Sequence, residues 1–116
     1  MEGKAMTLLQ RTANTLIKHG LCDGYPDFSQ RFCKRTPNFF YRQRFYGRDF
    51  PTDALLECLF KIREVNASYD RFATIFETEI SELAKIEKEL SEEIVKRLKL
   101  SDWRRAKYLA SLLELP

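Results

Sequence analysis

DFSQRFCKRTPNFFYRQRFYGR, residues 27–48, is the most informative stretch of this chain, because it reads as two short helices around one turn. Basic side chains alternate with Phe and Tyr rings along it. Between residues 28 and 50 there are six basic side chains and one acidic residue, Asp49, so this segment has a net charge of +5 whereas the whole chain has +3. A local positive field of this strength suits a phosphate backbone. The segment therefore favours nucleic-acid binding.

Residues that favour helix ends predict where the two helices of this stretch begin and end. The first is expected over residues 26–34 and the second over residues 37–46. Thr36 can cap the free backbone N–H groups of the second helix, and Pro37 suits its first position because no N–H is needed there. Gly47 can take the left-handed conformation that ends a helix.

Two further helices are predicted on either side of this stretch. Apolar residues recur at helical spacing from Ala5 to His19, and Gly20 follows as a stop signal. After Pro51, Thr52 is a cap for a helix that runs through Ile62.

The C-terminal half has a different character. Residues 68–99 contain neither Gly nor Pro and are rich in Glu, Lys, Leu and Ile, which predicts one long amphipathic helix. Ser101 then caps a short final helix. A helix of about 30 residues spans about 45 Å, so its apolar stripe is expected to meet the final helix, a second copy of the chain or another partner. Glu79 and Arg97 interrupt the stripe, which argues against a regular coiled coil. The expected dimerisation residues are Phe72, Phe76, Ile80, Leu83, Leu90, Ile94, Leu98, Trp103 and Leu109.

The order of the first four predicted helices resembles that of the lambda-repressor-like, Cro/CI-type helix-turn-helix DNA-binding family, over about residues 5–65. The resemblance rests on FSQRF at 28–32, RTPNFF at 35–40 and YGRDFPTDALLECLFKI at 46–62. The family usually has a small residue in the middle of the first motif helix, for which Ser29 is the candidate. It also has a Gly in the turn, where this chain has Cys33 and Lys34.

The resemblance implies that residues 37–46 form a recognition helix in the major groove, with its N-terminal part nearest the base edges. Arg42 suits guanine and Asn38 suits adenine, each through a pair of hydrogen bonds. The arginines that flank the helix suit phosphates. The DNA-binding residues expected on this basis are Arg35, Thr36, Asn38, Tyr41, Arg42, Arg44, Phe45 and Arg48.

The rings at Phe39, Phe40, Tyr41, Phe45 and Tyr46 are expected to be mostly packing residues, because aromatic side chains dominate core energetics. The helical period nevertheless places Tyr41 and Phe45 on the outward face. Exposed rings there could contact thymine methyl groups, or stack on unpaired bases of a single-stranded or RNA target.

The overall prediction is an all-α fold. A compact helix-turn-helix domain of four helices is expected in residues 1–65. A helical extension for dimerisation or partner binding, made of a long amphipathic helix and a final short helix, is expected in residues 66–116.

Several classes of function are not expected. Cys22, Cys33 and Cys58 form no C-x-x-C pair, which argues against a disulfide framework and a metal site. The single His19 has no triad partners that the sequence identifies, so neither an enzyme nor a cofactor is predicted. No apolar run reaches the roughly 20 residues of a membrane span, and no secretory signal is visible, which predicts a cytoplasmic protein without a membrane or an evident small-molecule substrate.

The sequence is consistent with two functions. The first is a small transcriptional regulator that binds specific duplex DNA sequences as a homodimer. The second is a non-enzymatic protein-interaction module, an adaptor or inhibitor, that uses the basic aromatic surface or the long helix to bind a protein.

Overall fold

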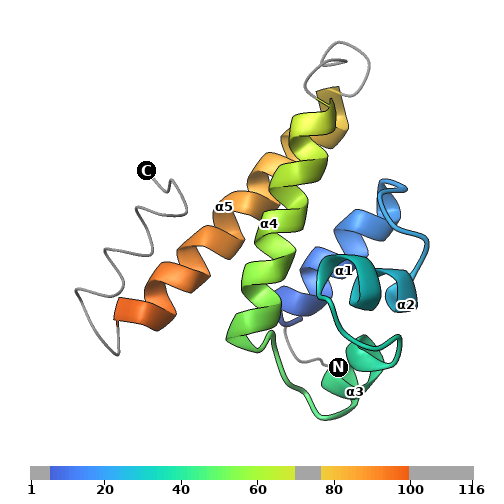
Figure 1. Ribbon diagram of the computed structural model, residues 1–116, viewed down its shortest axis with the longest axis vertical. Coiled ribbons are helices and arrows are strands. Elements are labelled where there is room, and N and C mark those ends of the chain that lie inside the picture. Colours follow the sequence, from blue (N-terminus) through green and yellow to red (C-terminus); the bar gives the residue numbers. More distant parts are fainter. Residues whose placement is uncertain (1–5, 70–76, 100–116) are drawn as a thin grey trace.

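The computed structural model describes residues 6–69 and 77–99, and every regular element within them is a helix (Figure 1). The all-α prediction is confirmed. In chain order the elements are α1 (Leu8–Lys18), α2 (Tyr25–Asp27), the π-helical turn η1 (Phe28–Phe32) that continues α2, α3 (Phe39–Phe45), α4 (Thr52–Tyr69) and α5 (Glu77–Lys99). No helix in the described ranges is both long and apolar enough to cross a membrane.

The two longest helices, α4 and α5, lie side by side and run in opposite directions (Figure 1). The shorter helices gather around one half of this pair: α1 packs against α5, η1 packs against α4, and α3 contacts both α2 and η1. In this arrangement α3 forms an end of the molecule, where one of its faces is left to solvent (Figure 1).

One hydrophobic core joins the described helices. The predicted boundary between residues 65 and 66 falls inside α4, and the core includes residues on both sides of it. The side chains that are completely inaccessible to solvent come from α1, η1, α4 and α5, and they include Leu9, Leu16, Phe28, Phe32, Leu55, Leu59, Leu83, Leu90 and Ile94.

The first helix begins at Leu8 rather than Ala5, and two acceptors satisfy its free N–H groups. The Thr7 hydroxyl accepts a hydrogen bond from the Gln10 N–H at 3.2 Å. The Asp49 carboxylate, from the loop before α4, accepts the Leu8 and Leu9 N–H groups at 3.0 and 2.8 Å. A negative charge at a helix N-terminus also interacts favourably with the helix dipole. This contact fixes the α3–α4 loop to the start of α1.

The predicted helix at 26–34 is shorter and ends in a π-helical turn. Its last turn closes through a hydrogen bond from the Cys33 N–H to the Phe28 carbonyl, five residues back. Lys34 follows with φ of 57°, in the left-handed region that costs a side-chain-bearing residue about 1–2 kcal/mol. The chain therefore turns at Lys34 without a glycine there.

The predicted start of α3 is wrong. The helix begins at Phe39 with Asn38 at its N-cap position, and no side chain caps it. Thr36 and Pro37 belong to the preceding turn, where the Thr36 carbonyl accepts the Phe39 N–H at 3.0 Å. The Thr36 hydroxyl lies 3.5 Å from the Arg42 guanidinium instead of capping the helix. The predicted stop is close to the observed one, since α3 ends at Phe45 and Gly47 has φ of 65°.

The single long helix predicted for residues 68–99 is also wrong. Helix α4 continues to Tyr69, and α5 packs back along it from Glu77 onward. The region contains neither Gly nor Pro to mark the reversal, which lets apolar residues of α5 be buried against α4 and α1. The predicted final helix lies outside the described residues.

The expected dimerisation stripe is largely used within the chain. Leu83, Leu90 and Ile94 are fully buried in the chain's own core, so they cannot also form a surface for a second copy. Leu98 is partly buried against the same core, and Ile80 is half-buried. The other four stripe positions lie outside the described residues, namely Phe72, Phe76, Trp103 and Leu109.

We expect the Leu90→Ala variant to lose about 2–5 kcal/mol of unfolding free energy, because a buried leucine leaves a cavity. Urea unfolding followed by circular dichroism measures this loss. If Leu90 belongs to the core of one chain, the urea midpoint should not change over an about hundredfold range of protein concentration. A midpoint that rises with protein concentration would instead place Leu90 at an interface between copies.

A second stability prediction concerns Ser29, whose buried hydroxyl accepts the Phe40 N–H at 3.1 Å. The Ser29→Ala variant should lose about 1–3 kcal/mol, since the Phe40 N–H is left without an acceptor. Ser68→Ala is the matched control, because the exposed Ser68 hydroxyl donates to the Glu64 carbonyl within the same helix and to no other described residue. Its expected effect is within about 0.5 kcal/mol. Equal losses in the two variants would contradict the role assigned to Ser29.

Candidate nucleic-acid interface

Helix α3 is anchored by its inner face. Phe39 and Phe40 are buried, and the Phe40 ring stacks on Tyr25 with centroids 4.0 Å apart and planes 3° from parallel. The Gln43 side-chain amide donates to the Asp49 carbonyl at 2.7 Å. Contacts at its beginning and middle thus fix the orientation of this short helix against α2 and the following loop.

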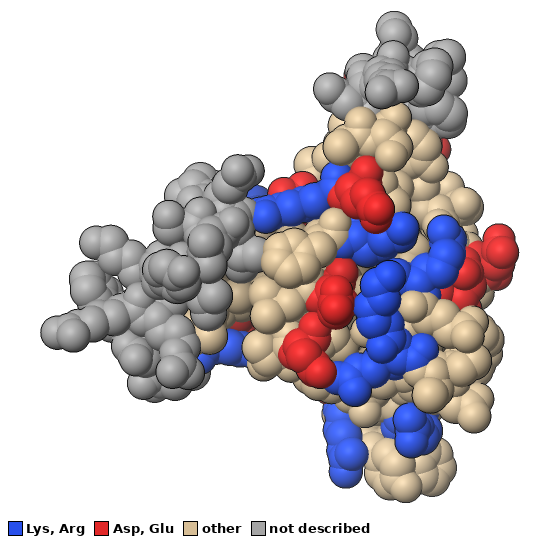
Figure 2. All heavy atoms as spheres, viewed as in Figure 1, with Lys and Arg blue, Asp and Glu red and all other residues tan. Residues whose placement is uncertain are grey.

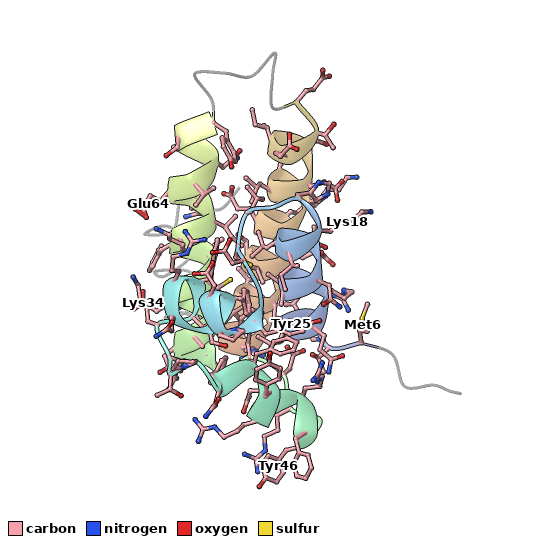
Figure 3. All side chains as sticks on the ribbon, turned by 90° about the vertical axis from the view of Figure 1, so that its right-hand side faces the viewer. Met6, Lys18, Tyr25, Lys34, Tyr46 and Glu64 are labelled. Carbon is pink, nitrogen blue, oxygen red and sulfur yellow. The ribbon has the colours of Figure 1, made fainter. Side chains whose placement is uncertain are left out.

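The outward face of α3 carries the four residues predicted for it. Asn38, Tyr41, Arg42 and Phe45 are all exposed, and Figure 3 shows this end of the molecule projecting beyond the helix bundle. Among the described residues, the Arg42 guanidinium has one hydrogen bond, to the Thr36 hydroxyl at the long distance of 3.5 Å, and no carboxylate pairs with it. Arg42 and Asn38 are therefore available to a ligand.

Two cations of the basic stretch are paired with carboxylates. Arg31 binds Asp27 through two hydrogen bonds of 2.7 and 2.9 Å. Arg35, one of the expected DNA-binding residues, pairs with Asp53 at the start of α4 and lies over the Phe39 ring. Since Arg35 is also half-buried, its guanidinium is less available than its place in the sequence predicts.

Two other arginines are held by aromatic rings. The Arg44 guanidinium lies 5.5, 5.6 and 5.5 Å from the ring centroids of Tyr25, Phe40 and Tyr41. The Arg48 guanidinium lies 4.8 Å from the Tyr46 ring centroid. Rings orient a guanidinium without neutralising its charge, and both arginines remain exposed. Their N–H donors are therefore positioned for an external anion.

An aromatic tip, made of Phe45 and Tyr46, lies at the C-terminal end of α3. Phe45 is 81% exposed and Tyr46 61% exposed. Figure 3 shows Tyr46 at the extreme end of the molecule, pointing away from the helices. The prediction that most of the five rings are packing residues holds for Phe39 and Phe40 and is wrong for Tyr46, whereas Tyr41 and Phe45 are exposed as the helical period predicted. Tyr46 and Lys34 also belong to the candidate interface, although neither was among the DNA-binding residues expected from the sequence. Lys34 is exposed, and no carboxylate among the described residues pairs with it.

Lys and Arg side chains form a band over the end of the molecule that contains α2 and α3, with smaller acidic groups beside it (Figure 2). The four basic residues in or next to α3 that have no carboxylate partner among the described residues are Lys34, Arg42, Arg44 and Arg48. This basic surface is the part of the described chain best suited to a polyanion.

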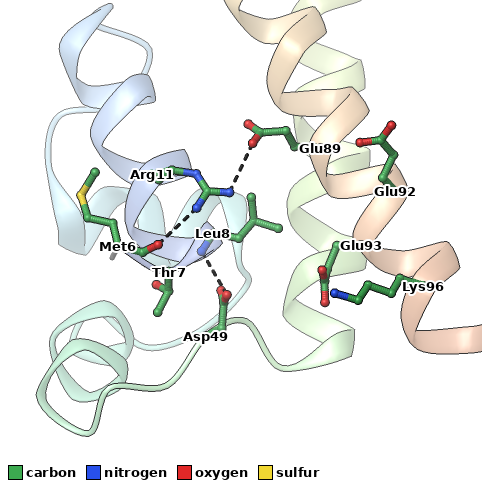
Figure 4. A pocket seen from close by; sticks show the side chains of 9 residues that line it. All are labelled: Met6, Thr7, Leu8, Arg11, Asp49, Glu89, Glu92, Glu93 and Lys96. Carbon is green, nitrogen blue, oxygen red and sulfur yellow. Dashed lines mark hydrogen bonds and ion pairs between the residues drawn. The ribbon is translucent and has the colours of Figure 1, made fainter. Parts of the chain in front are cut away.

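A pocket of about 340 Å³ between the start of α1 and α5 has the opposite character (Figure 4). Its ionisable residues are mostly acidic: Asp49, Glu89, Glu92 and Glu93, with Arg11 and Lys96. Arg11 is already bound to Glu89 at 3.2 Å, and Asp49 already accepts the N–H groups of α1. The pocket therefore repels phosphate groups and is set apart from the basic surface.

The three cysteines are buried and unpaired. Burial raises the pKa of the Cys22 thiol to about 11, and the nearby Asp27 carboxylate acts in the same direction. Burial likewise raises the pKa of Cys58, whose thiol contacts that of Cys33. Both thiols are protonated at neutral pH, which is typical of packing residues. Within the described residues no cluster of His, Cys, Asp and Glu could hold a metal ion.

The Asp27–Arg31 pair yields a prediction about pH. The hydrogen bond from Arg31, strengthened by the Arg31 charge, holds the pKa of the Asp27 carboxyl below its ordinary value. A depressed pKa means that the pair stabilises the fold above the ordinary pKa of about 3.9, and that this contribution is lost as pH falls through the folded-state value. Because the pair is partly exposed, its contribution should be below about 1 kcal/mol.

We expect the NMR titration of Asp27 to move back towards the ordinary carboxyl pKa in the Arg31→Gln variant. Lys88→Gln serves as the control, since it removes an exposed cation from another helix. An unchanged Asp27 titration in Arg31→Gln would show that Arg31 does not hold the carboxylate.

One family model matches the chain, over residues 9–106, and it is described as a family of unknown function (DUF6626). The matched span includes α2, η1, α3, α4 and α5, and all of α1 except Leu8. No curated protein and no solved structure matches the chain.

Proposed function

This chain belongs to the family of unknown function (DUF6626), and we propose that it is a non-enzymatic, sequence-specific DNA-binding protein, a small transcriptional regulator that uses α3 as its recognition helix. The observation that carries the proposal is the outward face of α3. Arg42 and Asn38 are exposed there without a strong partner, beside cations whose charge no described carboxylate neutralises.

The dimensions of α3 suit the major groove. An α-helix with its side chains is about 10–12 Å in diameter, and the groove, about 12 Å wide, admits one. In this arrangement Arg42 binds the O6 and N7 atoms of guanine, and Asn38, at the N-terminal end of the helix, binds adenine. Arg44 and Arg48, oriented by their ring contacts, and Lys34 in the preceding turn bind phosphates and set the register on the duplex.

The order of the short helices also supports the proposal. Helices α1, α2 with η1, α3 and α4 follow one another as in the lambda-repressor-like family that residues 5–65 resemble. The left-handed Lys34 lies in the turn where that family usually has Gly, and the buried Ser29 lies where it usually has a small residue.

A protein-interaction module remains the second candidate, and the aromatic tip is the observation that favours it. Exposed aromatic side chains beside arginines are enriched at protein interfaces. In that case the basic surface would bind an acidic protein. Tight binding to duplexes of one sequence in preference to others separates the two candidates, because an acidic protein partner requires no base recognition.

Homodimerisation and a cytoplasmic location are further parts of the proposal that the geometry of α3 does not require. Leu83, Leu90 and Ile94 are used in the core, so a dimer would need a surface other than these three residues. The proposed DNA contacts are those of one copy of the chain on one half-site.

We expect Arg42→Ala to weaken binding to a selected duplex by about 1–3 kcal/mol and to relax the preference at one base pair. A selection from random duplexes supplies the site, and fluorescence anisotropy at two salt concentrations measures the affinity. Wild-type affinity should fall steeply with salt, because bound phosphates release counterions. Lys88→Ala is the matched control: it removes one exposed cation from α5, away from α3, and should leave the affinity nearly unchanged.

Two results would contradict the proposal. One is undetectable duplex binding at low salt by the folded wild-type chain. The other is an equal loss of affinity in Arg42→Ala and Lys88→Ala, which would indicate a general charge effect rather than recognition by α3.

A further inference from the structure

The aromatic tip exposes two large rings to solvent, and the DNA contacts proposed for Arg42, Asn38 and the neighbouring cations do not use them. Phe45 is 81% exposed and Tyr46 61%, whereas the neighbouring Phe39 and Phe40 are 6% and 1% exposed. Exposed large rings are unfavourable in water, and a contiguous pair of them is typical of a contact site.

The two rings of the tip contact each other, and Arg48 contacts one of them. The two rings meet edge to face, with centroids 5.0 Å apart and planes at 87°. Arg48 covers the Tyr46 ring at 4.8 Å, and the Arg48 N–H bonds to the Gln43 carbonyl at 2.8 Å beyond the left-handed Gly47. A ring that is already held loses little conformational freedom when a ligand stacks on it. Phe45, the more exposed of the two rings, is the better surface for stacking.

The surroundings of Phe45 define the chemistry of its ligand. On a helix it shares a face with Tyr41, four residues earlier, and with Arg42, three residues earlier. The cations of the basic surface flank it on the same helix and in the following turn. A flat ring beside several positive charges matches a nucleotide, which has a base to stack and a phosphate to pair.

We propose that Phe45 stacks on an unpaired base next to the duplex held by α3, so that the preferred DNA is a duplex with a single-stranded tail. This inference rests on the proposed function and specifies its substrate. An unpaired base is favoured over a paired one, because opening a stacked step costs more than one aromatic stack returns. The recognition face and Phe45 then contact the same DNA on the two sides of the junction.

The test compares two probes, a blunt duplex and the same duplex with a short single-stranded tail that carries 2-aminopurine at its first unpaired position. The wild-type chain should bind the tailed probe about tenfold more tightly, and the 2-aminopurine fluorescence should fall on binding. Phe45→Leu should bring the ratio of tailed-probe to blunt-probe affinity to about one and remove the fluorescence change. Phe45→Trp should keep both effects.

Phe60→Leu is the matched control, because Phe60 is also exposed, at 48%, but lies on α4 rather than on α3 or the turns beside it. It should behave as the wild-type chain. Equal wild-type binding of both probes, or a preference that survives in Phe45→Leu, would overturn the stacking role and leave duplex binding intact. Absence of blunt-duplex binding would overturn the proposed function. In that case, binding of the tailed probe that Phe45→Leu abolishes would still support stacking by Phe45. Any other result would refute it.

Discussion

The buried hydroxyl of Ser29 is the contact on which the position of α3 depends. It donates to the Tyr25 carbonyl at 2.8 Å and accepts the Phe40 N–H at 3.1 Å, so one oxygen atom joins α2 and η1 to α3. The Phe40 ring can then stack on Tyr25, and both rings contact the Arg44 guanidinium. A hydroxyl satisfied as both donor and acceptor costs little to bury, whereas a missing partner would leave a polar group unpaired in the core. The orientation of the outward face therefore follows from a contact on the inward one.

Helix α5 supports the same region from the other side, although its sequence predicted a separate extension. Arg97 bonds to the Phe50 carbonyl at 2.7 Å and to the Thr52 hydroxyl at 3.2 Å, while Glu93 holds its guanidinium at 2.9 Å. Asp49, next to Phe50, is bound in turn to the start of α1. The loop after α3 is thus fixed by two helices that are distant in sequence. Arg97 interrupts the apolar stripe for a structural reason, since it satisfies backbone and side-chain oxygens of this loop.

Charge counting identified the basic stretch but not the availability of its members. Arg31 and Arg35 are bound by carboxylates, and Arg44 and Arg48 are held by rings. These two environments have opposite consequences, because a carboxylate neutralises a guanidinium whereas a ring face leaves its charge and its outer donors in place. The positive field of the segment is consequently concentrated on α3 and the turns on either side of it. Neither Asp53 nor Tyr25 is close enough in sequence to its arginine for local rules to reveal the pairing.

Local chain chemistry was sufficient to predict the helical class, the approximate span of α1, the stop at Gly47 and the outward positions of Asn38 and Arg42, because these follow from the helical period and from backbone preferences of single residues. Long-range packing decided the rest. It left Thr36 outside α3, turned the chain back between α4 and α5, buried Leu83, Leu90 and Ile94 of α5 in the chain's own core and exposed Tyr46. Each outcome depends on which surfaces meet in three dimensions. An apolar or aromatic residue can be buried in the core or exposed on a surface, and the residues packed against it decide which.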